Sequence, residues 1–346
     1  MFRPVFIVGN ARSGTTWIHR ILSQDENNFT SPHLWEILFA QSVAWRVLFH
    51  NLGKFDAKFG GILLRTIGLF DHYVLAKVSV HPIGVWQEEE DEWLMMNVAC
   101  CQLSALLLPL IDDFSDLIYF DRSLPAESRH AIFEYYKSCV QRHLYAREYI
   151  SNKKSVGFRR RYSAVTQQVR YLSKNPSFTL RINTIFEKFP DAEIVVLVRN
   201  PFKAIPSMVS YIARCWRFFA TPTVKYPFKK TLTHMCSLHY TYPLKFRKAN
   251  RRFSKQICVV HYELCVHDLV KSCSDLYSHL GMNITGGMAA VLNEEASLTR
   301  HYNSSHRYDL METCGMTSSQ FVQKHRDAFA FFPGYLKKPL SPLPKE

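Results

Sequence analysis

The chain has 346 residues, of which 47% are hydrophobic, and its formal net charge is +14. These values exclude a disordered chain and predict one enzyme-sized domain over residues 1–335, followed by a flexible tail at 336–346. The excess of positive charge predicts an anionic partner, such as a membrane surface, an acidic glycan or a nucleic acid. Because the sequence carries no nucleic-acid-binding motif, we expect no nucleic acid among the partners.

The nine cysteines and the fifteen histidines lack the paired spacing of a zinc site, so we expect reduced thiols and no metal. Met1 lies a few residues before the first predicted strand, which leaves no room for a leader peptide. The longest apolar runs, 60–80 and 103–111, are too short or too interrupted by charges to span a bilayer. We therefore expect a cytoplasmic protein. The sequence leaves open peripheral association with a membrane, a homodimer and a trimmed luminal domain.

The first predicted element is a buried strand at residues 5–8, and a helical pattern opens at Thr15. Between them, Gly9 and Gly14 bracket four residues, as in the loop G-x-x-x-x-G-K-[ST] that holds a diphosphate on backbone N–H groups. Thr15 stands where that motif has its lysine, and Arg12 supplies a cation two residues before the second glycine. The loop therefore predicts a site for a 5′-diphosphate-like group without γ-phosphate chemistry.

A largely helical insertion is predicted next, over roughly residues 37–150. The apolar pattern resumes at 32–38 around one carboxylate, Glu36, with His33 beside it. The aromatic and aliphatic residues of 40–80 are expected mostly in the core, and part of them could line an acceptor pocket or a membrane-facing lip. The acidic run at 88–92 is typical of a solvated helix start.

The second half of the chain alternates predicted strands and helices. Strands are predicted at 164–172, 194–198 and 257–263, and helices at 180–189, 232–253 and 270–280, the last closed by Gly281. Arg199 follows the second of these strands, where open α/β sheets bind ligands, and Ser207 lies about two helical turns further on. This order predicts an α/β fold with a central, mostly parallel sheet between layers of helices.

Residues 9–17 and 196–207 together resemble the two cofactor signatures of the sulfotransferase superfamily, in the broad branch that includes protein-tyrosine and bacterial-type sulfotransferases. Enzymes of this superfamily share a P-loop-containing three-layer fold and transfer a sulfuryl group from 3′-phosphoadenylyl sulfate (PAPS), as co-substrate, to a hydroxyl acceptor. The resemblance implies that the first loop holds the 5′-phosphosulfate through Arg12, Ser13, Gly14, Thr15 and Thr16. It also implies that Arg199 and Ser207 hold the 3′-phosphate and that Tyr262 lies near the adenine or its phosphate.

The resemblance implies catalytic residues as well. In this branch a glutamate soon after the phosphate loop removes the proton from the acceptor hydroxyl, which implies Glu36 as base, with His33 as the neighbouring alternative. A Lys-x-Pro element implies that Lys174, together with Arg12, stabilises the charge that develops on the leaving phosphate.

A His-Pro and Glu-Glu element often lies near the acceptor in this branch. The resemblance therefore adds His81, Glu88 and Glu89 as residues that contact the acceptor or act as base. The acceptor itself stays open among a lipid, a sterol, a phenol, a glycan and a tyrosine.

One element of the cytosolic small-molecule enzymes, a Gly-x-x-Gly-x-x-Lys loop, is absent from this sequence. Ser304, Ser305 and Arg307 are the candidates for the contacts to the 3′-phosphate that this loop would supply. Two other functions stay in competition. A nucleotide kinase or NTPase of the same loop class would bind ATP, and a catalytically inactive protein of this fold would bind PAP without turnover.

Overall fold

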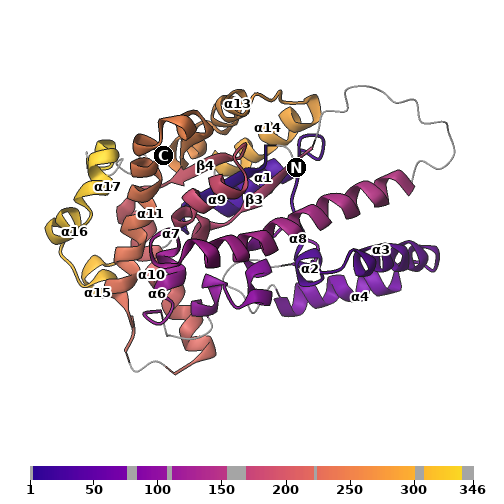
Figure 1. The fold of residues 1–346 in the computed structure, drawn as a ribbon, viewed down its shortest axis with the longest axis horizontal. Helices are drawn as coiled ribbons and strands as arrows, with labels where there is room; N and C mark the ends of the chain where they lie inside the picture. The colour runs from indigo at the N-terminus through magenta and orange to yellow at the C-terminus, as the bar shows by residue number, and fades with distance from the viewer. Residues whose placement is uncertain are drawn as a thin grey trace, which may run out of the picture.

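The computed structural model describes residues 3–75, 84–106, 111–153, 169–221, 224–300 and 308–336. Within these ranges, five parallel strands form one sheet in the order β2-β3-β1-β4-β5 (Figure 1). The strands are β1 (Val5–Gly9), β2 (Phe29–Thr30), β3 (Arg170–Lys174), β4 (Glu193–Val198) and β5 (Ile257–His261). The predicted α/β fold with a central parallel sheet is confirmed.

The side chains of β1 and β4 alternate between the two faces of the sheet, because successive residues of a strand point to opposite sides. Phe6 and Val196 belong to the hydrophobic core on one face, and Ile7 and Leu197 belong to the core on the other. All four side chains are at most 1% exposed. Both faces of the sheet are therefore covered, which explains the uninterrupted apolar runs of these strands.

Two layers of helices cover the sheet. The first face carries α8 (Ala126–Lys153), α9 (Ile182–Lys188), α10 (Pro201–Phe219) and α11 (Lys229–Ala249). The second face carries α1 (Thr15–Ser23), α12 (Tyr262–His267), α13 (Leu269–Leu280) and α14 (Gly286–Arg300). The chain ends with α15 (Leu310–Cys314), α16 (Ser318–Lys324) and α17 (Arg326–Phe331), of which α15 and α17 pack against α11.

The chain between β2 and β3 carries α2 (Leu34–Leu38), α3 (Val43–Lys58), α4 (Ile62–Phe70), α6 (Ser115–Ile118), α7 (Phe120–Ser123) and α8. The apolar residues of 40–80 are expected mostly in the core, and for the described part of that segment this expectation is wrong. Trp45, Phe55 and Phe59 are 50%, 60% and 63% exposed. The helices α3 and α4 instead form a hairpin below α8, away from the sheet (Figure 1).

Strand β3 begins later than the sequence pattern indicates. The predicted strand spans 164–172, whereas β3 spans Arg170–Lys174, and residues 161–168 lie outside the described ranges. The register explains the shift, because β3 pairs with β1 through Leu172 opposite Val5 and Lys174 opposite Ile7. Lys174 is therefore the last residue of its strand and lies at the edge of the sheet that carries the phosphate loop.

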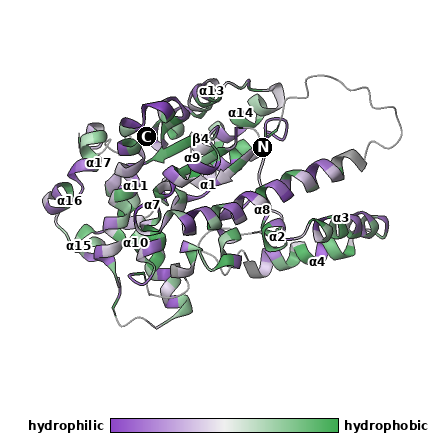
Figure 2. Cartoon of the chain, in the orientation of Figure 1, coloured by the Kyte–Doolittle hydropathy of each residue, from purple (hydrophilic) through white to green (hydrophobic). Residues whose placement is uncertain are grey.

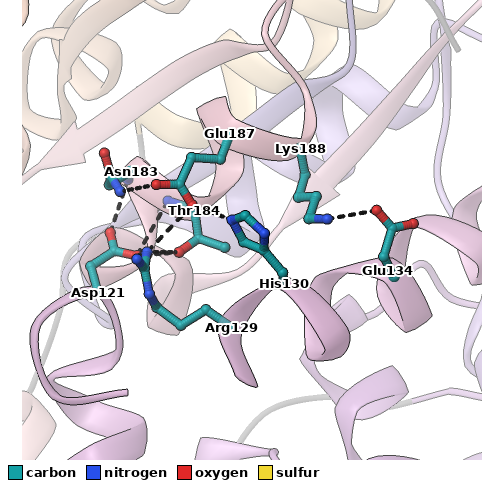
Figure 3. Close-up of polar contacts among 8 residues, drawn as sticks. All are labelled: Asp121, Arg129, His130, Glu134, Asn183, Thr184, Glu187 and Lys188. Carbon is teal, nitrogen blue, oxygen red and sulfur yellow. Dashed lines mark hydrogen bonds and ion pairs between the residues drawn. The ribbon is translucent and has the colours of Figure 1, made fainter. Parts of the chain in front are cut away.

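A network of polar side chains fastens α9 to α7 and α8 (Figure 3). Asp121 accepts hydrogen bonds from the backbone N–H groups of Asn183 and Thr184 at the start of α9, at 2.9 and 3.2 Å. Arg129 of α8 donates to the Thr184 hydroxyl at 2.8 Å and lies 3.4 Å from the Glu187 carboxylate. Helix α9 connects β3 to β4, so this network holds in place the two strands that end in Lys174 and Arg199.

Among the helices of the described ranges, none combines the length and the apolar content that crossing a bilayer requires. The cysteine, histidine, aspartate and glutamate side chains of the same ranges form no group of three that could hold a metal ion. The described cysteines are free thiols.

Candidate active site

The loop after β1 depends on glycine at both of its ends. Gly9 has φ +127°, and a Cβ atom on it would lie 2.1 Å from the backbone oxygen of Leu197 in β4. Gly14, the N-cap of α1, has φ +88°, and a Cβ atom on it would lie 2.5 Å from the ring of Tyr262. Side chains at these two positions would block the close approach of β4 and of the ring, so the spacing recognised in the sequence has a steric cause.

A cavity of about 530 Å³ opens in front of this loop and of the first turn of α1. It is lined by Arg12, Gly14, Thr15, Thr16, Trp17, Arg20, Ile21, Gln24, Arg199, Tyr262, Glu295, Leu298 and Thr299. The first N–H groups of a helix have no acceptor within the helix, so the start of α1 adds donors to the guanidinium groups of Arg12 and Arg199. This set of donors suits an anionic ligand with several phosphate-like groups.

Arg199 is fixed at the mouth of this cavity by contacts on two sides. Its Nη1 atom donates to the backbone oxygen of Arg12 at 3.0 Å. Its guanidinium group lies over the ring of Tyr262, 4.5 Å from the centroid, and the Tyr262 ring meets the edge of Trp17. The predicted cation after β4 and the predicted tyrosine after β5 are therefore brought together with the phosphate loop.

Ser207 lies on α10 and contacts the other cation of the site. Its hydroxyl accepts a hydrogen bond from Nε of Arg12 at 3.2 Å and donates to the hydroxyl of Tyr308 at 3.3 Å. Arg12 thus bridges the phosphate loop and α10. Ser207 and the fully buried Ser13 do not line the large cavity. Their roles in binding stay predictions, and Ser304, Ser305 and Arg307 lie outside the described residues.

Lys174 forms an ion pair with a glutamate that the sequence analysis did not select. Its Nζ atom lies 2.7 Å from Oε1 of Glu90, and the Lys174 side chain is fully buried. Glu90 lies in the same acidic run as Glu88 and Glu89. Glu88 is paired with His33 in an isolated β-bridge, which makes this part of the run extended. Because side chains alternate along extended backbone, Glu88 and Glu90 share a side. The sequence carries no signal for this pairing, so it could not have singled out Glu90.

The acidic run does start a helix, a 3₁₀ helix at Asp91–Val98, but it is not solvated, because Glu89, Asp91 and Glu92 are at most 4% exposed. Asp91 is 0% exposed and accepts hydrogen bonds from Tyr136, Tyr171, Ser173 and Asn175 at 2.5 to 3.3 Å. Burial raises the pKa of Asp91 to about 6, although these hydrogen bonds oppose the shift. The Asp91 carboxylate therefore holds Ser173 and Asn175, the residues on either side of Lys174, and is not a surface group.

The raised pKa of Asp91 predicts a characteristic pH dependence of stability. Its folded pKa of about 6 lies above the ordinary value of 3.8, so the folded state binds more protons between these two values. The contribution of Asp91 to the free energy of unfolding should therefore fall by about 2 kcal/mol as pH rises from 4 to 7. Urea unfolding of the wild-type chain and of Asp91→Asn across this range measures the difference. Parallel pH profiles of the two chains would contradict the assignment.

A second, narrower cavity of about 100 Å³ lies on the other side of the phosphate loop. Ala11 of the loop lines it, together with mostly apolar side chains that include Leu103, Met208, Tyr211, Ile212 and Met235. Glu90 lines the same cavity, and the Arg12 guanidinium lies 5.5 Å from the centroid of the Tyr211 ring. The mostly apolar cavity therefore contains two carboxylates, Glu90 and Glu92, and Glu90 is paired with the Lys174 ammonium beside it.

Glu36 has a different surrounding from the one expected of a base. It is residue N3 of α2, and its Oε2 atom accepts from the backbone N–H of His33 at 2.9 Å, in a capping box. Burial alone would raise the pKa of Glu36, but His143, His33 and Arg46 outweigh burial and lower it to about 2. Glu36 lines neither of the two cavities. Its catalytic role stays a prediction.

The remaining acceptor-side candidates of the described residues, His33, Glu88 and Glu89, each have a charged or ionisable partner. His33 Nε2 is 3.9 Å from the Glu88 carboxylate. The carboxylate of Glu89 is 3.4 Å from Arg20, which lines the large cavity, and burial raises the pKa of Glu89. His81 lies outside the described residues.

Comparison with known proteins connects this geometry to a family. The model of the sulfotransferase family matches residues 4–286 of the chain. Two relatives are the omega-hydroxy-beta-dihydromenaquinone-9 sulfotransferases Stf3 of Mycobacterium bovis and Mycobacterium tuberculosis. Each is 25% identical over 285 residues, which are 81% of this chain and 63% of the relative. The chain thus spans less than two thirds of the length of these relatives.

Solved structures of this family share the fold. The sulfotransferase STF9 from Mycobacterium avium superposes with a TM-score of 0.68 at 17% identity, over 98% of this chain and 78% of that one. The sulfotransferase STF1 from Mycobacterium tuberculosis H37Rv superposes with a TM-score of 0.59 at 16% identity, over 94% and 76% of the two chains.

Proposed function

The chain belongs to the sulfotransferase family, and we propose that it transfers a sulfuryl group from PAPS to a hydroxyl group of an apolar acceptor. The observation that carries this proposal is the pair of cavities on the two sides of one loop. Arg12 lines the cavity with the anion-binding donors, whereas its neighbour Ala11 lines the apolar cavity that contains Glu90. An anionic donor and an apolar acceptor would thus meet at the loop.

The residues of the large cavity suit PAPS. Gly14, Thr15 and Thr16 at the start of α1 line this cavity, where the free N–H groups of a helix start can hold a phosphate group, and the absence of a side chain at Gly14 lets the Tyr262 ring pack beside them. Arg12, Thr15 and Thr16 would hold the 5′-phosphosulfate, to which Ser13 would contribute its backbone. Arg199 and Ser207 would hold the 3′-phosphate, and Tyr262 would contact the adenosine part. The bound nucleotide would supply the sulfuryl group.

Three charged side chains would have separate roles: Glu90, which lines the narrow cavity, its ion-pair partner Lys174, and Arg12 of the phosphate loop. Glu90 would accept the proton that the acceptor hydroxyl loses as its oxygen attacks sulfur. Lys174 and Arg12 would stabilise the negative charge that develops on the leaving phosphate. The ion pair with Lys174 orients the Glu90 carboxylate, and the Glu90 side chain keeps 19% exposure, which leaves it accessible to an acceptor.

Glu90 is preferred here over Glu36 as the base. A base needs direct access to the acceptor hydroxyl. The low pKa of Glu36, about 2, makes it a weak proton acceptor. Its Oε2 atom is also engaged by two groups of His33, the backbone N–H and Nδ1.

Two observations support an apolar acceptor. The cavity beside Glu90 has mostly apolar walls. The named activity of the Stf3 relatives concerns a hydroxylated dihydromenaquinone, which is an apolar molecule with a hydroxyl group. We therefore rank lipids and sterols above glycans and tyrosine peptides as acceptors of this chain.

The test is a transfer assay with ³⁵S-labelled PAPS and a panel of acceptors. The panel contains a hydroxylated isoprenoid quinone, a sterol, a simple phenol, a tyrosine peptide and an acidic glycan. We expect labelled product with the quinone or the sterol. Product from the glycan or peptide alone would overturn the acceptor class, and nucleotide binding without any product would favour an inactive PAP-binding protein.

A further inference from the structure

The hairpin of α3 and α4 exposes a long apolar stripe. Four residues of α3 and its C-cap follow alternating spacings of three and four and share one side of the helix: Trp45, Leu48, Leu52, Phe55 and Phe59. They are 43% to 63% exposed. In a helix of a globular protein, an apolar stripe like this one faces the protein core or a binding partner. Here α3 packs against α8 and α4 with its other sides, and this stripe stays uncovered in the described structure.

Helix α4 extends the same apolar surface. None of its residues is buried, and Ile62, Leu63, Leu69 and Phe70 are 49% to 67% exposed. Figure 2 shows hydrophobic residues along α4, at the lower edge of the molecule. Contiguous apolar surfaces of this extent are rare on soluble monomers and mark sites of contact with a protein or a membrane.

The charges of the hairpin are one-sided. Lys54, Lys58 and Arg65 are exposed basic residues. Asp56 is the single acidic residue between positions 43 and 70. Its carboxylate accepts hydrogen bonds from the backbone N–H groups of Leu63 and Leu64, both at 3.0 Å, and so caps α4. The hairpin therefore presents apolar side chains with positive charge around them, which complements the surface of a bilayer that contains anionic lipids.

The hairpin adjoins the candidate active site. An aromatic cluster at its base joins Trp45 to Phe39 and Phe49, and Trp35 to Phe49 and Trp86. Trp35 also donates its backbone N–H to Val85, in the segment that leads to the acidic run. The exposed apolar surface thus continues to within a few residues of Glu88 and Glu90.

We propose that the hairpin of α3 and α4 docks this protein on an anionic bilayer, with its apolar stripe in the interfacial region. The helices have 16 and 9 residues, too few to cross a bilayer, so they lie in its surface. A second copy of the chain is a poorer partner for this face, because a symmetric contact would bring the basic residues of two hairpins together. Docking would bring the candidate active site close to acceptors that reside in the membrane.

Vesicle sedimentation tests the proposal without any need for turnover. The wild-type chain is mixed with vesicles of phosphatidylcholine alone or with 30% phosphatidylglycerol. We expect at least about tenfold stronger partition to the anionic vesicles, and weaker partition as salt is raised. The triple variant Phe55→Gln, Phe59→Gln, Ile62→Gln should lose at least about tenfold in partition, because it removes apolar groups that would enter the interface.

Two controls keep the result specific. The variant Leu264→Gln, Val270→Gln changes exposed apolar residues of α12 and α13 and should partition like the wild type. Helix α13 lies on the opposite side of the molecule from the hairpin (Figure 1), and α12 packs against it. The unfolding midpoint of the triple variant should equal that of the wild type, since the three side chains are exposed. No partition of the wild type, or equal partition of the triple variant, would overturn the proposal. A dimer by light scattering that the triple variant abolishes, without vesicle binding, would identify a second copy as the occupant.

Discussion

Replacing Glu90 with glutamine is expected to lower turnover by about 10²- to 10⁴-fold, the usual contribution of a general base. The glutamine amide oxygen can still accept a hydrogen bond from Lys174, so the buried ammonium group of this ion pair keeps a partner. Binding of the nucleotide should change little, because Glu90 does not line the large cavity. Single-turnover transfer from ³⁵S-labelled PAPS measures the chemical step, and the shift of the unfolding midpoint with PAP measures binding.

Glu36→Gln is the matched control for this experiment. It makes the same chemical change in a carboxylate that the sequence analysis selected as base and that caps α2 in the structure. We expect it to lower stability and to leave the single-turnover rate within about tenfold of the wild type, because Glu36 lines neither cavity. A large loss in Glu36→Gln together with an unimpaired Glu90→Gln would restore Glu36 as the base.

Replacing Gly9 with alanine is expected to lower the free energy of unfolding by at least about 4 kcal/mol. The new Cβ atom would lie 2.1 Å from the backbone oxygen of Leu197, at a φ of +127° that L residues rarely adopt. Relief would require β1 and β4 to separate, because the atom it meets is backbone and belongs to a central strand. Urea unfolding monitored by circular dichroism measures the loss.

Gly53→Ala is the control, because it makes the same glycine-to-alanine change at a position where the new Cβ atom meets no other atom. Gly53 lies inside α3, and a Cβ atom on it would meet nothing within 4 Å. Alanine there should stabilise the chain by about 0.5–1 kcal/mol, since glycine weakens a helix interior. If Gly9→Ala were as stable as the wild type, the close approach of β1 and β4 at the loop would be wrong.

The fold and the nucleotide side of the site follow from local patterns in the sequence. The strands β1, β4 and β5 are short apolar runs, and Gly9, Arg199 and Tyr262 stand at their carboxyl ends or directly after them. Parallel strands end at one edge of a sheet, so residues at the ends of separate strands meet without any further information. This is why Arg199 could be predicted beside the phosphate loop, whereas the place of Tyr262 near the nucleotide was implied by the resemblance to the sulfotransferase superfamily.

The acceptor side could not be predicted in the same way. The partner of Lys174 depends on which carboxylate of the acidic run faces β3, and this depends on the pairing of His33 with Glu88. The burial of Asp91 depends on Tyr136, which is 45 residues away on α8. Such contacts join segments whose separation in sequence carries no periodic signal.

The hairpin of α3 and α4 shows the limit of hydrophobicity as a guide to burial. Its apolar residues have helical spacing, which is equally typical of a helix that faces a core and of one that faces a membrane. Trp45 and Phe59 therefore look like core residues in the sequence and are half or more exposed in the structure. The basic residues beside them distinguish the two situations, because they would be costly in a core.

The central claim, that the large cavity binds the nucleotide of a sulfotransferase, is tested most directly by titration with PAP and, separately, with ATP. A ligand that binds only the folded chain raises the unfolding midpoint. We predict a rise with PAP and none with ATP. The PAP shift should disappear in Arg199→Ala and persist in Lys203→Ala, which removes an exposed positive charge from α10 outside the cavity. A shift with ATP alone, or a PAP shift unchanged by Arg199→Ala, would contradict the account.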